Sequence, residues 1–282
     1  MKRIVCTTLV VLGLVAMAAA QAGTASAPAP QLSISQRKIP PAAKSQEENT
    51  AYRAIVTNAD LGAAEAAAKD FEAKYPQSEL TYGIYENLMY RYQQANNAEK
   101  TVEMGRKVLQ FDSDNPMALV TVASVLAERT RDTDLDRDQR LAEAMKDAQR
   151  AIDTMGNWLA TTPRITDEQA PGVKQALASL AHAAMGRVEM TRKNPAEAEK
   201  HYRTSVELDP ARPDALTFLR LALALDAQKK YAEALTAAKR AVELSATTGG
   251  PVADWAKQEQ DRLTKLTGQA PPAQTTAPPP KS

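Results

Sequence analysis

Four aspartates stand at alternate positions in one polar stretch of the sequence, RTRDTDLDRDQR, which spans residues 129–140. Calcium-binding loops of the EF-hand type place oxygen ligands at positions 1, 3 and 5 and a glutamate at position 12. The spacing in this stretch matches those positions and therefore suggests calcium chemistry. The candidate ligands are Asp132, Asp134, Asp136 and Glu143.

Two features of the same stretch argue against calcium. Position 6 of such a loop needs the backbone freedom of glycine, but Arg137 occupies it here. Three arginines also accompany the four aspartates between residues 131 and 140, which leaves a net charge of only −1. We therefore predict that the stretch binds no metal. It is better explained as a polar insertion ordered by a local Asp–Arg network, whose exposed ion pairs contribute about 0–1 kcal/mol each.

Other patterns that could support catalysis are weak in this sequence. His182 and His201 are the two histidines, and two histidines without a third ligand make a poor zinc site. The sequence contains no GxSxG, HExxH, P-loop or GxGxxG motif. Its single cysteine, Cys6, lies in a segment that we expect to be removed, which leaves no thiol nucleophile. We predict that the protein is not an enzyme and needs no cofactor.

The composition narrows the class of partner and the kind of core. The 35 basic and 34 acidic residues nearly balance, and nucleic-acid-binding proteins usually carry a basic face. We therefore expect no nucleic-acid partner. Aromatic residues make up 5% of the chain, so its core must consist mainly of Ala, Leu, Val and Met. Small side chains of this kind suit closely packed helices.

The N-terminal residues have the pattern of an export signal. Lys2 and Arg3 precede the apolar run IVCTTLVVLGLVAMAAA, which small-residue cleavage sites follow. We predict a signal peptide over 1–22, cleaved near Ala20 or Ala22. The alternative is an uncleaved anchor, although 17 residues are at the low end for spanning a bilayer. Membrane contact is expected only through this segment.

Proline-rich segments lie on both sides of the central part of the chain. Residues 23–44 are rich in Pro and Ala and predict a disordered linker. Residues 268–282 contain the run APPPKS and predict a Pro-rich disordered tail. The folded part of the protein is therefore expected between these segments.

Helical periodicity is clear between the two proline-rich segments. In KKYAEALTAAKRAVELS, residues 229–245, apolar side chains recur every three or four positions on one face. The stretch NPAEAEKHYRTSVELDP, residues 194–210, repeats this design. A small residue recurs within five such helices at intervals of 37, 43, 54 and 36 residues, so each interval has room for two helices and a turn. These small residues are Ala64, Thr101, Ala144, Ala198 and Ala234.

The pattern resembles the tetratricopeptide repeat (TPR) family, in a form exported by bacteria. The fifth repeat matches it at Phe218, Ala222, Leu225, Tyr231, Ala234, Ala238, Ala241 and Leu244. The fourth repeat matches at Gly186, Ala198, Tyr202, Leu208 and Pro210. FEAKYPQSEL is also similar to the helix ends of envelope repeat proteins that work at bacterial outer membranes.

The resemblance implies an all-α fold, a right-handed α-solenoid of antiparallel helix pairs. About five hairpins would occupy 45–248, and a capping helix over 249–267 would cover the open end with Trp255, Leu263 and Leu266. The long interval before Ala198 predicts a loop at 156–166, which Trp158 would pin to the stack. The alternative is that Trp158 is displayed for a partner.

By the same resemblance, the first helices of the hairpins would line a concave binding face. Tyr85 and Tyr92 are seven residues apart and are expected in the core, whereas Tyr90 falls on a different face. Exposed aromatic side chains beside amides suit peptide binding. The alternative for Tyr90 is a half-buried surface tyrosine. The candidate binding residues are Asn49, Arg53, Glu86, Asn87, Tyr90, Gln93, Thr121, Ser124 and Arg187.

The sequence therefore predicts a non-catalytic scaffold of the bacterial cell envelope that binds a protein or peptide partner. The exported chain would be periplasmic or associated with the envelope. The alternative is a structural subunit of an envelope assembly that packs through its outer faces. The sequence does not identify the partner.

Overall fold

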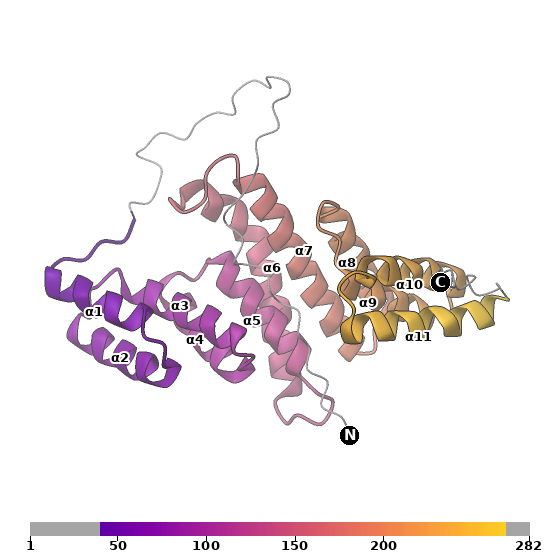
Figure 1. The fold of residues 1–282 in the computed structure, drawn as a ribbon, viewed down its shortest axis with the longest axis horizontal. Helices are drawn as coiled ribbons and strands as arrows, with labels where there is room; N and C mark the ends of the chain where they lie inside the picture. Colours follow the sequence, from indigo (N-terminus) through magenta and orange to yellow (C-terminus); the bar gives the residue numbers. More distant parts are fainter. Residues whose placement is uncertain (1–39, 269–282) are drawn as a thin grey trace, which may run out of the picture. The chain divides into compact units, whose positions relative to one another are not determined.

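The computed structural model describes residues 40–268, and this part of the chain is all-α (Figure 1). The predicted signal peptide, most of the predicted linker and nearly all of the predicted tail lie outside the described residues. Eleven helices, and no strands, are found within 40–268. They are α1 (Gln46–Val56), α2 (Leu61–Lys74), α3 (Thr81–Gln94), α4 (Ala98–Phe111), α5 (Pro116–Arg129), α6 (Arg137–Thr161), α7 (Ala170–Thr191), α8 (Pro195–Leu208), α9 (Ala215–Ala227), α10 (Tyr231–Ser245) and α11 (Gly250–Thr267).

The helices form five consecutive hairpins, from α1 and α2 to α9 and α10, followed by α11. Side chains at the helix starts explain several boundaries. Asp60 accepts a hydrogen bond from the backbone N–H of Ala63 at 3.0 Å, and Asn97 accepts one from Lys100 at 3.1 Å. Such caps satisfy amides that have no partner inside the helix. Pro195 begins α8, where its missing N–H costs little.

The predicted repeat register is confirmed by burial and by the turns. All five small residues, Ala64, Thr101, Ala144, Ala198 and Ala234, are buried in the second helix of their hairpins. Within 40–268, three non-glycine residues have positive φ, and each lies five positions before one of these small residues. They are Asn96, Lys193 and Lys229. Three hairpins thus turn with the same backbone geometry, whereas the third hairpin has a longer turn over 130–136.

The described chain divides into two compact units. The first unit holds residues 40–129 and 150–174, and the second holds 130–149 and 175–268. Each unit therefore contains a portion of α6 and a portion of α7. The core of the first unit is centred on Ile84, Tyr85, Leu88 and Met89 of α3, which are fully buried. The prediction that Tyr85 and Tyr92 are core residues is confirmed.

The core of the second unit is built from smaller side chains. Ala198, Ala222, Ala234 and Ala238 are fully buried between α8, α9 and α10. Gly186 of α7 lies against the ring of Tyr202, where a Cβ atom would come within 2.7 Å of a ring carbon. A glycine is needed at this position because any side chain would displace a buried ring.

Helix α11 closes the second unit, as predicted, by packing on α10 and α9. Leu263 is buried, and Trp255 packs beside Leu219, Ala241 and Ala256. The expectation for Leu266 is wrong, because 53% of this side chain is exposed. Within the described part of the chain, every helix is too short or too polar to span a bilayer.

The connection between α6 and α7 differs from the sequence prediction. Helix α6 continues to Thr161, so the loop predicted at 156–166 is instead the segment 162–169. Trp158 lies inside α6, where it is buried, and its Nε1 donates a hydrogen bond to Asp112 Oδ2 at 2.8 Å. The predicted pinning role of Trp158 is therefore present, but it fixes the end of a helix.

Candidate functional site

The predicted binding residues lie on the first helices of their hairpins. Asn49 and Arg53 are on α1, Thr121 and Ser124 are on α5, and Arg187 is on α7. The other four, Glu86, Asn87, Tyr90 and Gln93, are on α3. All except Arg187 belong to the first unit. The structure thus brings most of the set into one unit.

Apart from Arg53, these residues are buried or half-buried. Thr121 and Ser124 are buried, which corrects the expectation that they meet a partner, and Glu86 is only 7% exposed. The reason is that their helix faces pack inside the first unit. Arg53 is exposed, whereas Asn49, Asn87, Tyr90 and Gln93 are half-buried.

Tyr90 is the half-buried tyrosine of the alternative interpretation. Its hydroxyl donates a hydrogen bond to Met117 Sδ of α5 at 3.2 Å. Burial raises the pKa of Tyr90, and the nearby charge of Glu86 raises it further. The phenol therefore stays neutral, with its ring partly available at the surface.

Arg164, in the connection between α6 and α7, completes the group, and sequence reasoning missed it. Its Nη1 forms an ion pair with Oε2 of Glu86. Its guanidinium carbon also lies 5.0 Å from the centre of the Tyr82 ring, in the range of a cation–π contact. Burial opposes the charge of Arg164, but Glu86 outweighs that effect and the pKa of Arg164 is raised. We call Tyr82, Glu86, Asn87 and Tyr90 the α3 seat.

The α3 seat has hydrogen-bonding capacity that its neighbours do not use. Glu86 Oε1 and Asn87 Oδ1 are both buried, and no donor within residues 40–268 reaches either atom. Buried acceptors without a partner are uncommon and costly. The seat could therefore accept further N–H groups from a bound molecule.

Apolar contacts hold the connection beside this seat. Ile165 is buried together with Trp158 and Leu159, and Met117 packs against the same cluster. Met117 is also the residue that Tyr90 contacts. The segment 162–169 thus reaches the α3 seat from within the same unit.

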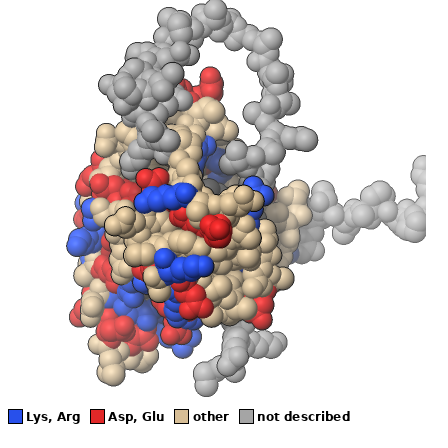
Figure 2. Space-filling view, turned by 90° about the vertical axis from the view of Figure 1, so that its left-hand side faces the viewer, with Lys and Arg blue, Asp and Glu red and all other residues tan. Residues whose placement is uncertain are grey.

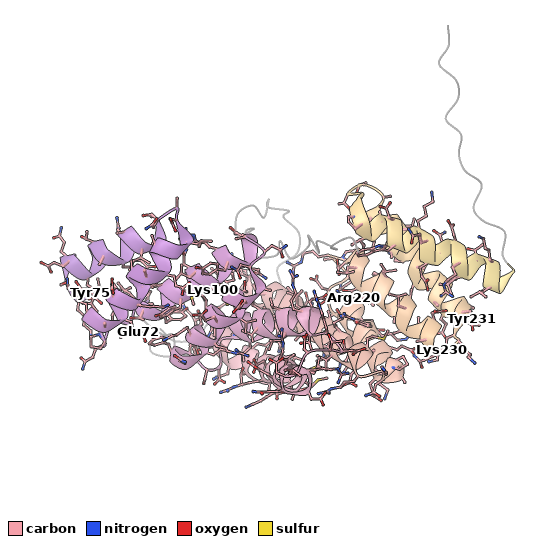
Figure 3. All side chains as sticks on the ribbon, turned by 90° about the horizontal axis from the view of Figure 1, so that it is seen from below. Glu72, Tyr75, Lys100, Arg220, Lys230 and Tyr231 are labelled. Atoms are coloured by element: carbon pink, nitrogen blue, oxygen red, sulfur yellow. The ribbon has the colours of Figure 1, made fainter. Side chains whose placement is uncertain are left out.

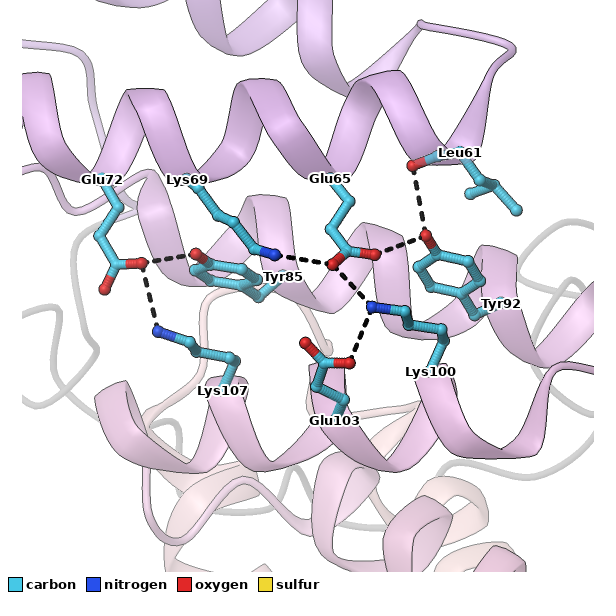
Figure 4. A network of polar contacts seen from close by, with 9 residues as sticks. All are labelled: Leu61, Glu65, Lys69, Glu72, Tyr85, Tyr92, Lys100, Glu103 and Lys107. Carbon is cyan, nitrogen blue, oxygen red and sulfur yellow. Dashed lines mark hydrogen bonds and ion pairs between the residues drawn. The ribbon is translucent and has the colours of Figure 1, made fainter.

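A buried glutamate joins the hairpins of the first unit (Figure 4). Glu65 of α2 accepts hydrogen bonds from Tyr92 at 2.7 Å, from Lys100 at 2.8 Å and from Lys69 at 3.0 Å. Burial alone would raise the pKa of Glu65, but these donors lower it to about 2. Burial and the bond to Glu65 raise the pKa of Tyr92 to about 12. This cluster is fully satisfied and therefore structural.

Glu199 of α8 occupies the corresponding position in the second unit. It accepts hydrogen bonds from Gln228 and Lys230 at 2.7 Å and from Arg203 at 2.9 Å. Burial opposes its charge, but these donors lower its pKa. Lys230 directly precedes Tyr231, the first residue of α10 (Figure 3).

The aspartate run forms the predicted Asp–Arg network. Arg137 pairs with Asp132 at 3.3 Å and with Asp138 at 2.6 Å, and it also donates to the backbone oxygen of Thr191 at 2.7 Å. Asp134 accepts a hydrogen bond from the backbone of Arg131 at 2.9 Å. Between residues 40 and 268, no three His, Cys, Asp or Glu side chains are grouped so as to hold a metal ion.

The two histidines meet in the second unit. Nδ1 of His182 on α7 lies 3.1 Å from Nδ1 of His201 on α8. Burial lowers the pKa of both imidazoles, and the charge of His201 lowers that of His182 further. One ring must donate and the other accept, so the pair is stable only while it is not doubly protonated.

The surface is a mixture of charges. On the face drawn in Figure 2, Lys and Arg side chains stand next to Asp and Glu side chains. Such a distribution gives little long-range attraction for a polyanion.

Solved structures of known proteins share the helical arrangement. MamA is 17% identical, with a TM-score of 0.50, over 71% of this chain and 93% of that chain. PilF of Pseudomonas aeruginosa is 20% identical, with a TM-score of 0.51, over 79% of this chain and 87% of that chain. No protein-family model matches the sequence, and no curated protein shows significant similarity to it.

Three observations identify the fold: the successive hairpins, the small residues buried in register, and the similarity to these two structures. The chain has the tetratricopeptide repeat fold. At such low identity the likeness extends to the fold alone. In TPR terms, α3 is the first helix of the second repeat. Sequence reasoning found the helix but not the arginine that covers it.

Proposed function

We propose that this chain is a non-catalytic scaffold that binds a protein or peptide partner through the α3 seat. The observation that carries the proposal is the pair of buried acceptors, Glu86 Oε1 and Asn87 Oδ1, beside the half-buried ring of Tyr90. A partner that supplies N–H donors would satisfy both acceptors while it buries apolar surface. Interfaces commonly combine aromatic anchors with such polar groups.

The α3 side chains of the seat are held in place by packing, which supports binding with little rearrangement of α3 itself. Tyr82 and Tyr90 are on one helix, and the packed side chains of α3 and α5 fix their positions. A rigid site loses less conformational entropy when a partner binds. Repeat proteins build extended binding surfaces from such helix faces.

We further propose that the scaffold works in the bacterial cell envelope. Support comes from the sequence, where Lys2 and Arg3 precede an uncharged apolar run of 17 residues and small residues follow. A balanced net charge of +1 suits a protein partner better than a nucleic acid.

The test compares variants of the purified full chain in pull-downs from a periplasmic extract. Tyr90→Ala with Arg53→Ala should reduce the retained partner about tenfold, because truncating an interface anchor commonly costs 1–2 kcal/mol. Arg240→Ala is the control, since it changes an exposed ion pair with Glu243 in the other unit. Unchanged retention in the double variant would favour a structural subunit that packs through its outer faces.

A further inference from the structure

The connection between α6 and α7 already places a ligand-like group on the α3 seat. Arg164 is 78 residues away from Glu86 in the sequence, yet its guanidinium is paired with this buried carboxylate. The same guanidinium lies over the ring of Tyr82. A planar cation between a carboxylate and an aromatic face is an arrangement typical of arginine recognition.

We propose that the segment 162–169 is an internal ligand of the α3 seat, and that the partner presents an arginine which replaces Arg164. This inference rests on the proposed function, because it names the chemistry of the partner at the same site. The partner segment would be extended and would carry an apolar residue after its arginine, as Ile165 follows Arg164 here.

The charge of the seat selects a cation. Glu86 is 7% exposed, and a buried carboxylate without a partner is strongly destabilising. Some cation must therefore occupy the seat whenever Glu86 is ionised. When a partner arrives with its own arginine, that arginine replaces Arg164 as the partner of Glu86. The buried carboxylate therefore stays paired, and the displaced guanidinium of Arg164 passes into water.

The unused acceptors favour arginine over lysine. Arg164 reaches Glu86 through Nη1, while Glu86 Oε1 and Asn87 Oδ1 remain without donors among the described residues. A guanidinium presents five N–H donors in a fixed plane, so an incoming arginine could serve both oxygens of Glu86. An ammonium group lacks the plane that stacks on Tyr82.

The resident arginine is held in a way that permits exchange. Its side chain is 40% exposed, although its partner is buried. Within the connection, Thr166 and Gln169 hydrogen-bond to each other and not to α3. Ile165 provides the apolar contact through Trp158 and Leu159. Displacing the segment breaks, among its contacts, the partly exposed ion pair with Glu86, the contact with the Tyr82 ring and the apolar packing of Ile165.

The experiment measures binding of a fluorescent peptide, ATTPRITDEQ, which copies residues 160–169. The parent chain should bind it weakly, because its own Arg164 competes. The double variant Arg164→Ala, Ile165→Ala should bind the peptide about tenfold more tightly. This gain is expected if the α3 seat is vacant in roughly a tenth of the parent molecules and in nearly all molecules of the variant. Peptides with lysine or alanine in place of the arginine should bind at least about fivefold more weakly.

Two further variants make the result decisive. Glu86→Gln added to the double variant should abolish the gain in affinity, whereas Arg240→Ala alone should bind the peptide as the parent does.

If circular dichroism shows that the double variant does not fold, Arg164→Lys provides the test, with an expected gain in affinity of about threefold. Equal binding by the parent and the displaced variants would overturn the inference. If Tyr90→Ala still weakened partner retention in that case, the proposed function would stand without it.

Discussion

The two units build the junction between successive hairpins around the same position with different chemistry. In each, a buried glutamate directly follows the small residue of a second helix: Glu65 after Ala64, and Glu199 after Ala198. Each glutamate pairs with a basic residue four positions later on its own helix. Each also receives a lysine and one neutral donor from the next hairpin.

The two junctions differ in the neutral hydrogen-bond donor to the glutamate and in the charge of the residue that precedes the next small residue. The first unit uses the hydroxyl of the buried Tyr92, whereas the second uses the amide of Gln228. The residue just before the next small residue is Lys100 in the first unit and Glu233 in the second, where it pairs with Arg203. The fold therefore fixes where a charge is buried, and each junction can neutralise it with its own set of partners.

Two tryptophans allow the units to be compared separately. Trp158 belongs to the first unit and Trp255 to the second. In a chain carrying Trp255→Phe, fluorescence reports the first unit, and in one carrying Trp158→Phe it reports the second. These two single-tryptophan chains are used to test the predictions on Glu65 and Glu199 and the prediction on pH.

The largest effect is expected from removing the glutamates. Glu65→Ala should lower the free energy of unfolding of the first unit by about 3 kcal/mol, because it leaves the buried hydroxyl of Tyr92 without its main acceptor. Glu199→Ala should cost the second unit only about 1 kcal/mol. Gln228 keeps the backbone oxygens of Pro195 and Ala224, and Lys230 and Arg203 are partly exposed. Urea unfolding measures both, and equal losses would show that the junctions do not differ.

An intermediate effect is expected from acid. Because burial lowers the pKa values of His182 and His201, the unfolded chain takes up protons more readily than the folded chain below the ordinary pKa of 6.5. The second unit should therefore lose stability as the pH falls below about 6.5. Glu65, whose pKa is about 2, contributes fully above its ordinary pKa of 4.5 and loses that contribution progressively as the pH falls from 4.5 to about 2, so it is unaffected between pH 7 and pH 5.

The measurement is the urea midpoint of each unit at pH 7 and pH 5. The midpoint of the second unit should fall more than that of the first, and His201→Gln should reduce the difference. Charged groups near His201, including Glu189, Glu197 and Lys200, remain in that variant. A fall of equal size in both units, or one that His201→Gln leaves unchanged, would contradict the assignment to this pair.

The smallest effect is expected in the aspartate run. Asp134→Ala should change the free energy of unfolding by no more than about 0.5 kcal/mol, because its surroundings are exposed ion pairs. Calcium should leave the melting temperature of both the parent and the variant unchanged. A rise with calcium in the parent alone would show that these carboxylates bind the ion after all.

The hairpins were predictable because their signal is local. A small residue must lie where two helices approach closely, and the burial of Ala64, Ala198 and Ala234 confirms that reading. Where local preference and packing disagree, the sequence misleads. The long interval before Ala198 predicted a loop from residue 156, yet α6 continues to Thr161 because Trp158 and Leu159 are buried there.

The α3 seat was predicted only in part. Tyr90, Glu86 and Asn87 followed from their places on one helix, but Arg164 comes from a distant connection and no periodicity places it there. The one available signal was Ile165, an apolar residue in an otherwise polar segment. Glu65 and Glu199 could have been found by aligning the residues that follow the small positions.

The left-handed turns at Asn96, Lys193 and Lys229 divide the chain at equivalent points. Residues from Lys193 to Lys229 form a cassette with the same backbone conformation at both ends, composed of the second helix of one hairpin and the first helix of the next. A second copy of 194–229 spliced in after Lys229 would present its own Glu199 to a Gln228 and to Lys230, whereas the first Glu199 would keep its Gln228 and have Asn194 of the copy in place of Lys230. Because each hairpin in such arrays contacts only its neighbours, the array could grow by one unit with a single new junction, the one between α9 and the copied α8.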